Sequence, residues 1–164
     1  MKSEKTPDNI LKLSDMLRYI IYDCNADRVP LEKELNYINN YIDLQKLKDD
    51  KITNIEIDFK EVDIKSMIAP MIFIPFIENS FKHSKIEDLE QGWIKMKIRH
   101  VNGDLLFEIS NSTTREEYTK DKIGGVGLEN VKRRLELLYP GKHDLKIETS
   151  DDTFLVELKV SLGN

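Results

Sequence analysis

The sequence predicts an α+β fold in which helices cover one face of a sheet, preceded by a two-helix hairpin. Two stretches, 10–24 and 31–44, repeat apolar residues at spacings of three and four, which is the period of an amphipathic helix. From Ile55 the apolar period changes to two, and strand-like and helix-like segments follow in mixed order. We therefore expect a helical hairpin over 1–50 and a second domain over 51–164.

The predicted hairpin presents wide apolar faces. The first helix carries its stripe at Ile10, Leu13, Leu17, Ile20 and Cys24, and the second at Leu31, Leu35, Ile38 and Ile42, widened by Tyr37, Tyr41 and Leu44. Pro7 and Asp8 mark the start of the first helix, and Pro30 suits the first position of the second. Two helices alone cannot bury such a face, so a second copy that completes a four-helix bundle is expected. The alternative is that these helices pack only on the rest of the chain.

Composition excludes several classes of function. The 164 residues carry 25 Lys and Arg against 30 Asp and Glu, and the net charge of -5 argues against a protein that binds nucleic acid. A single cysteine, Cys24, cannot form an internal disulfide and fits a reducing compartment. The apolar run 67–77 is far shorter than the roughly 20 residues that span a bilayer, and no signal peptide opens the chain.

The second domain is predicted element by element. Alternation predicts a strand over Ile55 to Phe59, and an apolar stripe predicts a helix over Ala69 to Ser84 with Pro70 in its first turn. Two strands, Trp93 to Val101 and Leu105 to Ser110, meet at the turn pair Asn102-Gly103. A long loop is expected over Asn111 to Gly127, followed by a helix from Leu128 to Pro140-Gly141 and a final hairpin of strands 145–149 and 154–160.

Chemistry is predicted on one face of the helix that contains Pro75 to His83. Asn79 stands three and four residues before Lys82 and His83, so their side chains share one surface, beside Glu78. A nucleotide-bound Mg²⁺ takes one or two protein oxygens such as a carboxamide, and a lysine complements phosphate charge. The alternative is a solvated helix face without ligand.

A glycine-rich turn ends the long loop. Gly124-Gly125-Val126-Gly127-Leu128 stands where a loop meets a helix, and there free amides and the helix dipole favour an anion such as phosphate. The alternative is a flexible connection.

The two segments together carry a family resemblance. Residues 74–83 resemble the N box, and residues 125–135 the G2 box, of the GHKL ATPases, in the form found in LytS/YehU-like sensor histidine kinases that partner LytTR-type response regulators. Residues 13–19 and 31–45 resemble the segments that follow the phosphoacceptor histidine of those kinases. The resemblance implies the Bergerat fold, a two-layer α/β sandwich that binds ATP with Mg²⁺, and a two-component phosphotransferase.

The resemblance also implies roles for single residues. Asn79 matches the Mg²⁺ ligand, and Lys82 and His83 match phosphate contacts. Gly125 and Gly127, with Leu128 beside them, match the lid over the triphosphate, and Glu78 matches an acidic position where a catalytic base or water-positioning role is expected.

The adenine site departs from the family pattern. The Asp-x-Gly-x-Gly motif that reads adenine in the superfamily is missing, and Asn111-Ser112 follows the strand instead. Asn111 either accepts a hydrogen bond from the adenine amine or is a turn residue that ends the strand. Thr153, before the last strand, stands where the superfamily often supplies a hydroxyl near the base.

The acceptor histidine is the second departure. The three histidines are His83, His100 and His143, and neither N-terminal helix carries one. We expect His100 and His143 to be surface residues after a strand and after a turn. The chain is therefore expected to be the cytoplasmic C-terminal part of a bacterial inner-membrane sensor, unable to autophosphorylate by itself. The alternatives are a nucleotide-gated interaction module and a dimerisation scaffold without nucleotide.

Overall fold

The computed structural model describes residues 6–49, 51–113 and 125–163. The chain forms two compact units, one made of residues 1–50 and 64–71, the other of residues 51–63 and 72–164. The chain therefore passes from one unit to the other after residues 50, 63 and 71.

The first unit is built on two helices. Helix α1 spans Thr6–Arg18 and continues into a π-helical turn, Tyr19–Asp23, and helix α2 spans Leu31–Lys48. Two short strands, β1 (Val29–Pro30) and β3 (Met67–Ile68), pair antiparallel beside them. Both predicted helices are present, but Pro30 is the N-cap of α2 and not its first helical residue.

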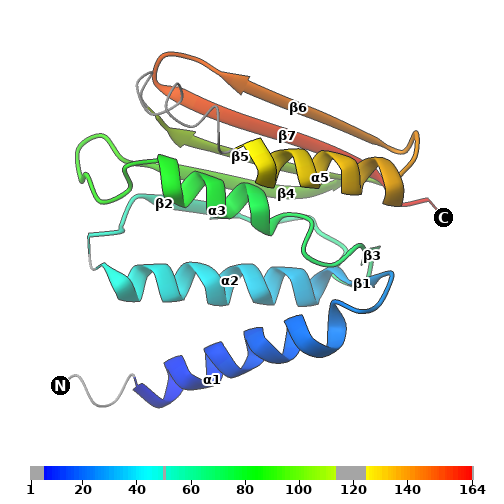
Figure 1. Cartoon of the computed structure of the whole chain (residues 1–164), viewed down its shortest axis with the longest axis horizontal. Helices are drawn as coiled ribbons and strands as arrows, with labels where there is room; N and C mark the ends of the chain where they lie inside the picture. Colours follow the sequence, from blue (N-terminus) through cyan, green and yellow to red (C-terminus); the bar gives the residue numbers. More distant parts are fainter. Residues whose placement is uncertain (1–5, 50, 114–124, 164) are drawn as a thin grey trace. The chain divides into compact units, whose positions relative to one another are not determined.

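The second unit is a five-stranded sheet with two helices on one face (Figure 1). The strands are β2 (Ile55–Asp58), β4 (Ile94–Val101), β5 (Asp104–Ser112), β6 (His143–Thr149) and β7 (Thr153–Ser161), in the order β2-β4-β5-β7-β6. Strands β2 and β4 are parallel, and the other pairs are antiparallel. Helices α3 (Ile74–His83) and α5 (Gly125–Leu138) complete the two layers, which confirms the predicted fold class.

The core of the second unit lies between the sheet and these helices. Every second residue is buried from Ile94 to Ile98 of β4 and from Leu105 to Asn111 of β5, as the period of two predicts. Phe107 of β5 stacks on Phe73 with ring centroids 4.7 Å apart and meets Phe76 at 6.0 Å. The face of β5 that carries Phe107 therefore faces α3.

Several boundaries differ from the predictions, among them the start of α5 at Gly125 and of β6 at His143. The helix expected over Ala69 to Ser84 begins only at Ile74, because Met67–Ile68 pairs as a strand and Met71 has a left-handed backbone (φ 57°) that no helix accommodates. Pro75, not Pro70, therefore occupies the first turn. Asn111 and Ser112 extend β5, and His100 lies within β4. Most of the loop predicted between Asn111 and Gly127 lies outside the described residues.

None of the described helices combines the length and apolar content that a membrane span requires.

Candidate nucleotide site

Helix α3 presents the polar face predicted for it. Phe76 and Ile77 are buried, which directs the opposite arc of the helix away from the core. On that arc Asn79 and His83 are half-buried, while Glu78 and Lys82 are exposed. A carboxamide, an ammonium and an imidazole therefore line one accessible helix surface.

Helix α5 starts beside α3 over the same face of the sheet (Figure 1). Gly125 is its first residue, and Gly127 is exposed. A Cβ atom added to Gly127 would meet nothing within 4 Å, so packing within the described part of the chain does not require glycine there. The open space leaves room for a ligand at the first turn, where backbone N–H groups lack helical acceptors. Leu128 is half-buried next to it.

Asn111 is buried in β5 on the α3 side of the sheet. It is fully buried and four residues beyond Phe107, so strand alternation places it on the face that carries Phe107. Its Nδ2 donates to the carbonyl oxygen of Ser112 at 2.7 Å, and within the described structure its Oδ1 accepts no hydrogen bond. A buried amide oxygen without a donor costs about 1–3 kcal/mol, which a ligand N–H would recover.

Two buried hydroxyls adjoin this region, and sequence analysis did not identify them. Ser80 lies next to Asn79 in α3, and Ser84 follows the end of the helix. The Oγ atoms of both are buried and lack a hydrogen-bond partner among the described residues. In the sequence, only the presence of a serine at position 80, between Asn79 and Phe81, indicates such a hydroxyl.

A hollow of about 240 Å³ opens at the ends of β4 and β5. Its lining includes Ser84, Trp93, Ser112 and Thr113. The Ser112 hydroxyl donates to the Ser84 carbonyl and accepts from the Trp93 N–H at 3.0 Å, so one side chain ties three segments of the wall together. The only tryptophan of the sequence thus reports on this hollow.

Thr153 starts β7 next to the same place. The strand register pairs Thr153 with Ser112 and the following residue with Asn111, so Thr153 is one position from Asn111. Its hydroxyl donates to Asp152 at 3.1 Å, and its side chain is half-buried. Because paired residues share a face of the sheet, the Thr153 side chain lies with Ser112 on the face opposite to Asn111, and its hydroxyl is committed to a turn residue.

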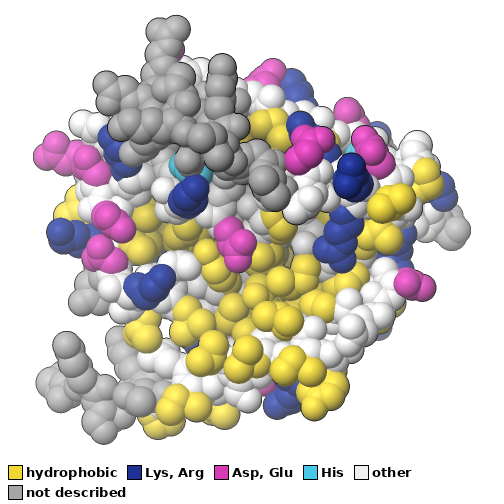
Figure 2. Space-filling model, viewed as in Figure 1, with side chains coloured by type: hydrophobic (Ala, Val, Ile, Leu, Met, Phe, Trp, Pro, Cys, Tyr) yellow, Lys and Arg dark blue, Asp and Glu magenta, His cyan; other side chains and the backbone are white. Residues whose placement is uncertain are grey.

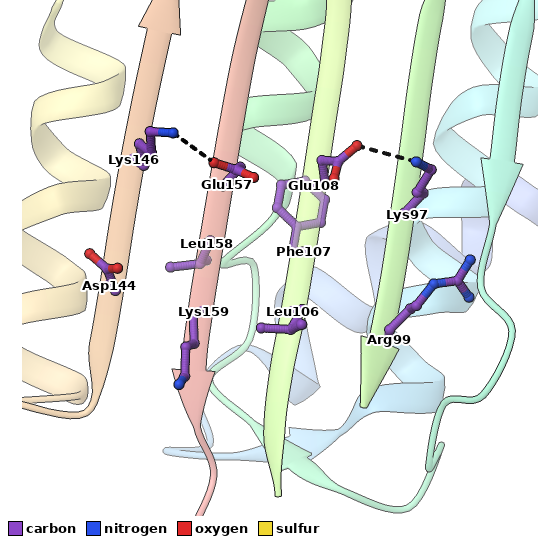
Figure 3. A pocket seen from close by; sticks show the side chains of 10 residues that line it. All are labelled: Lys97, Arg99, Leu106, Phe107, Glu108, Asp144, Lys146, Glu157, Leu158 and Lys159. Atoms are coloured by element: carbon purple, nitrogen blue, oxygen red, sulfur yellow. Dashed lines mark hydrogen bonds and ion pairs between the residues drawn. The ribbon is translucent and has the colours of Figure 1, made fainter. Parts of the chain in front are cut away.

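The outer face of the sheet, away from the helices, has a different character. A hollow of about 310 Å³ there is lined by charged residues of β4, β5, β6 and β7 (Figure 3). The dashed lines of Figure 3 mark two of the ion pairs across neighbouring strands, Lys97 with Glu108 at 3.4 Å and Lys146 with Glu157 at 3.3 Å. The lining carries four Lys or Arg against three Asp or Glu, so most of its positive charge is neutralised within the hollow.

The described residues contain no group of three or more His, Cys, Asp or Glu side chains that could hold a metal ion. A Mg²⁺ ion at α3 would therefore depend on the Asn79 carboxamide together with oxygens of its ligand.

The known proteins that this chain resembles in sequence are histidine kinases. The family profile described as histidine kinase matches residues 1–52. Sensor protein LytS of Staphylococcus saprophyticus is 26% identical over 173 residues, covering 99% of this chain and 29% of LytS. Sensor protein kinase HptS of Staphylococcus aureus is 27% identical over 144 residues, covering 82% of this chain and 27% of HptS. The chain thus spans less than a third of the length of these relatives.

The fold matches solved structures. The histidine kinase AdeS of Acinetobacter baumannii superimposes with a TM-score of 0.59, at 13% sequence identity, over 96% of this chain and 77% of AdeS. This likeness concerns the fold.

Proposed function

We propose that the chain is a GHKL-type sensor histidine kinase domain of the LytS-like family, and that its second unit binds Mg-ATP and supplies the γ-phosphoryl group for a histidine. The nucleotide would lie on the helix-bearing face of the sheet, against the polar arc of α3 and the first turn of α5. We place the adenine at the end of β5 and the phosphates toward Asn79 and Gly127.

The buried Oδ1 of Asn111 carries this proposal. Its Nδ2 already donates one hydrogen bond to the Ser112 carbonyl, whereas Oδ1 is a buried acceptor without a donor among the described residues. The exocyclic amine of adenine supplies the missing N–H group, whereas guanine would present a carbonyl oxygen. Asn111 can therefore replace the aspartate of the family pattern as an adenine reader. Thr153 remains a predicted second contact to the base.

The residues toward the phosphates fit their predicted roles chemically. The Asn79 carboxamide oxygen suits Mg²⁺, which keeps most of its waters and shares oxygens of the nucleotide. Lys82 and His83, one turn along α3, supply positive charge and N–H donors for the phosphates. Gly125, Gly127 and Leu128 would cover the triphosphate, with the lid itself predicted in a segment outside the described residues.

Phosphoryl transfer in this scheme depends on positioning and on charge neutralisation. When bound, Mg²⁺ neutralises developing charge on the phosphates. We propose that Lys82 orients the phosphates from α3, and that Glu78, exposed at the same surface, accepts a proton or orients a nucleophile. None of the three histidines lies in α1 or α2, so we propose an acceptor histidine outside residues 1–164.

The first unit supports the proposed homodimer. The predicted seam of α1 is exposed, with Ile10 at 63%, Leu13 at 50% and Leu17 at 49% of their full accessibility. Hydrophobic side chains gather over α1 in the lower part of Figure 2. A second copy would bury this arc in a four-helix bundle. We further propose a response regulator, of the LytTR type, as the phosphoryl acceptor protein, and a cytoplasmic location, where ATP is available.

Fluorescence of Trp93 tests nucleotide binding directly. We expect Mg-ATP to change this fluorescence saturably and GTP to bind at least about tenfold more weakly than ATP. Asn111→Ala should lose about tenfold in ATP affinity and most of the preference for ATP over GTP. Asn39→Ala, at an exposed position of α2, is the control and should bind as the unmodified chain does. Equal affinity for ATP and GTP, unchanged by Asn111→Ala, would place the adenine elsewhere.

A further inference from the structure

Segment 64–71 belongs to the helical unit, although about 15 residues separate it from α2 in the sequence. Strand β3 of this segment pairs with β1. The carbonyl oxygens of Ile64 and Ser66 accept from the N–H groups of Glu32 and Leu31 at 2.9 and 2.8 Å. The first N–H groups of a helix lack intrahelical acceptors, and Pro30 provides no side-chain cap. This segment therefore caps α2.

A buried carboxylate completes the junction. Glu34, in the first turn of α2, is 1% exposed, and its Oε1 accepts from the Met71 N–H at 2.7 Å and from the Tyr19 hydroxyl. Burial, with the negative charge of Glu34, raises the pKa of the Tyr19 hydroxyl, so it stays protonated and donating. A buried carboxylate is stable only when hydrogen-bonded. Glu34 therefore joins α2 to the end of α1 and to segment 64–71.

The bond to Met71 holds a strained backbone that shortly precedes α3 in the sequence. Met71 has φ 57°, a conformation that costs a non-glycine residue about 1–2 kcal/mol. Two residues later, Phe73 is fully buried and stacks on Phe107 of the sheet. Only Ile72 separates the residue held by Glu34 from the residue that anchors the start of α3.

Tyr19 opens the π-helical turn, where the Cys24 N–H donates to the Tyr19 carbonyl at 3.0 Å. π-Helical turns are rare and frequently occur at functional sites. A displacement of α1 that moves Tyr19 must either break its bond to Glu34 or alter the bond between Glu34 and Met71.

We propose that Glu34 is a positioning residue, a proposal that rests on the proposed function. Its carboxylate couples the helical hairpin to the start of α3, the helix that carries Asn79. Nucleotide binding at α3 then strengthens the junction, and by reciprocity the state of the hairpin changes nucleotide affinity. Glu34 itself does not touch the nucleotide.

Amide hydrogen exchange of the full chain, with and without Mg-ADP, tests the coupling. In the unmodified chain we expect nucleotide to slow exchange at Met71, Leu31 and Cys24 by at least about threefold. Glu34→Ala should bind Mg-ADP within about threefold of the unmodified affinity but lose this slowing. Glu34→Gln should restore it, because the carboxamide oxygen still accepts from Met71. Glu32→Ala, which removes an exposed carboxylate from the first turn of α2, is the matched control and should retain it.

A second variant separates the two hydrogen bonds of Glu34, to Met71 and to Tyr19, and provides the test if Glu34→Ala does not fold. Tyr19→Phe keeps the bond to Met71, so slowing at Met71 should remain while slowing at Cys24 disappears. Slowing that persists at all three amides in Glu34→Ala, or at Cys24 in Tyr19→Phe, overturns the coupling. Binding without any slowing in the unmodified chain overturns it as well. No binding of Mg-ADP to the unmodified chain overturns the proposed function instead.

Discussion

Replacing Asn111 with the aspartate of the family pattern should destabilise this protein. The Nδ2 atom that donates to the Ser112 carbonyl at 2.7 Å would become a carboxylate oxygen, which cannot donate. Two acceptor oxygens would face each other at a position with no solvent exposure. The carboxylate therefore either stays buried without compensation or takes up a proton.

The magnitude follows from the loss of a hydrogen bond and the burial of a charge. An uncompensated buried charge costs about 3–5 kcal/mol. For a chain of this size each kcal/mol lowers the Tm by roughly 2–4 °C, so Asn111→Asp should lower the Tm at pH 7 by about 6–20 °C.

The destabilisation caused by Asn111→Asp should depend on pH in a definite direction. Burial should raise the folded-state pKa of the new carboxyl above its unfolded value, so the protonated form is favoured in the folded protein. The destabilisation should then shrink as pH falls toward the unfolded pKa, near 4, and grow as pH rises.

Thermal unfolding of Asn111→Asp at several pH values provides the assay. Asn102→Asp makes the same chemical change at an exposed turn and should leave the Tm nearly unchanged. If Asn111→Asp is as stable as Asn102→Asp at pH 7, the carboxamide of Asn111 is not held as a buried donor, and the adenine argument built on its free Oδ1 fails with it.

Three further predictions concern charge and chemistry. In titrations, Lys82→Ala should weaken the binding of ATP at least about tenfold more than the binding of adenosine, while Lys97→Ala, on the outer face of the sheet, should weaken neither. Equal losses of affinity for both ligands would place Lys82 away from the phosphates. Arg99, 2.6 Å from Asp58, holds the pKa of that carboxyl below its usual value. The pair should therefore stabilise the fold above about pH 4 and lose this contribution as pH falls. An acid unfolding curve of Asp58→Asn that matches that of the unmodified chain would contradict this. Incubated with labelled Mg-ATP, the chain should form no acid-labile phosphohistidine, since neither α1 nor α2 carries a histidine, and stoichiometric label on any of its histidines would refute the separation of donor from acceptor.

Local sequence patterns predicted the regular elements because their causes are local. The alternation of β4 and β5 reproduces their buried positions, and the Asn102-Gly103 pair adopts positive φ at both residues, 54° and 85°, as a tight hairpin turn requires. The face of α3 that carries Asn79 followed from helical spacing in the same way.

Non-local contacts explain what the patterns did not show. The late start of α3 depends on strand pairing between β3 and β1 and on the bond from Met71 to Glu34. These contacts join residues 37 or 39 positions apart. The burial of Asn111 depends on the register of β5 with β7, since its own sequence neighbourhood is typical of a turn. Neither contact leaves a periodic signal.

Calorimetric titration of Mg-ATP into the full chain and into Asn79→Ala tests the central claim most directly. We expect the unmodified chain to bind Mg-ATP and to bind it more weakly when EDTA removes Mg²⁺. Asn79→Ala should lose at least about tenfold in affinity, because a metal ligand and its charge-assisted contacts are lost. Tight binding by Asn79→Ala, unchanged by EDTA, would contradict the assignment of α3 as the Mg-ATP site.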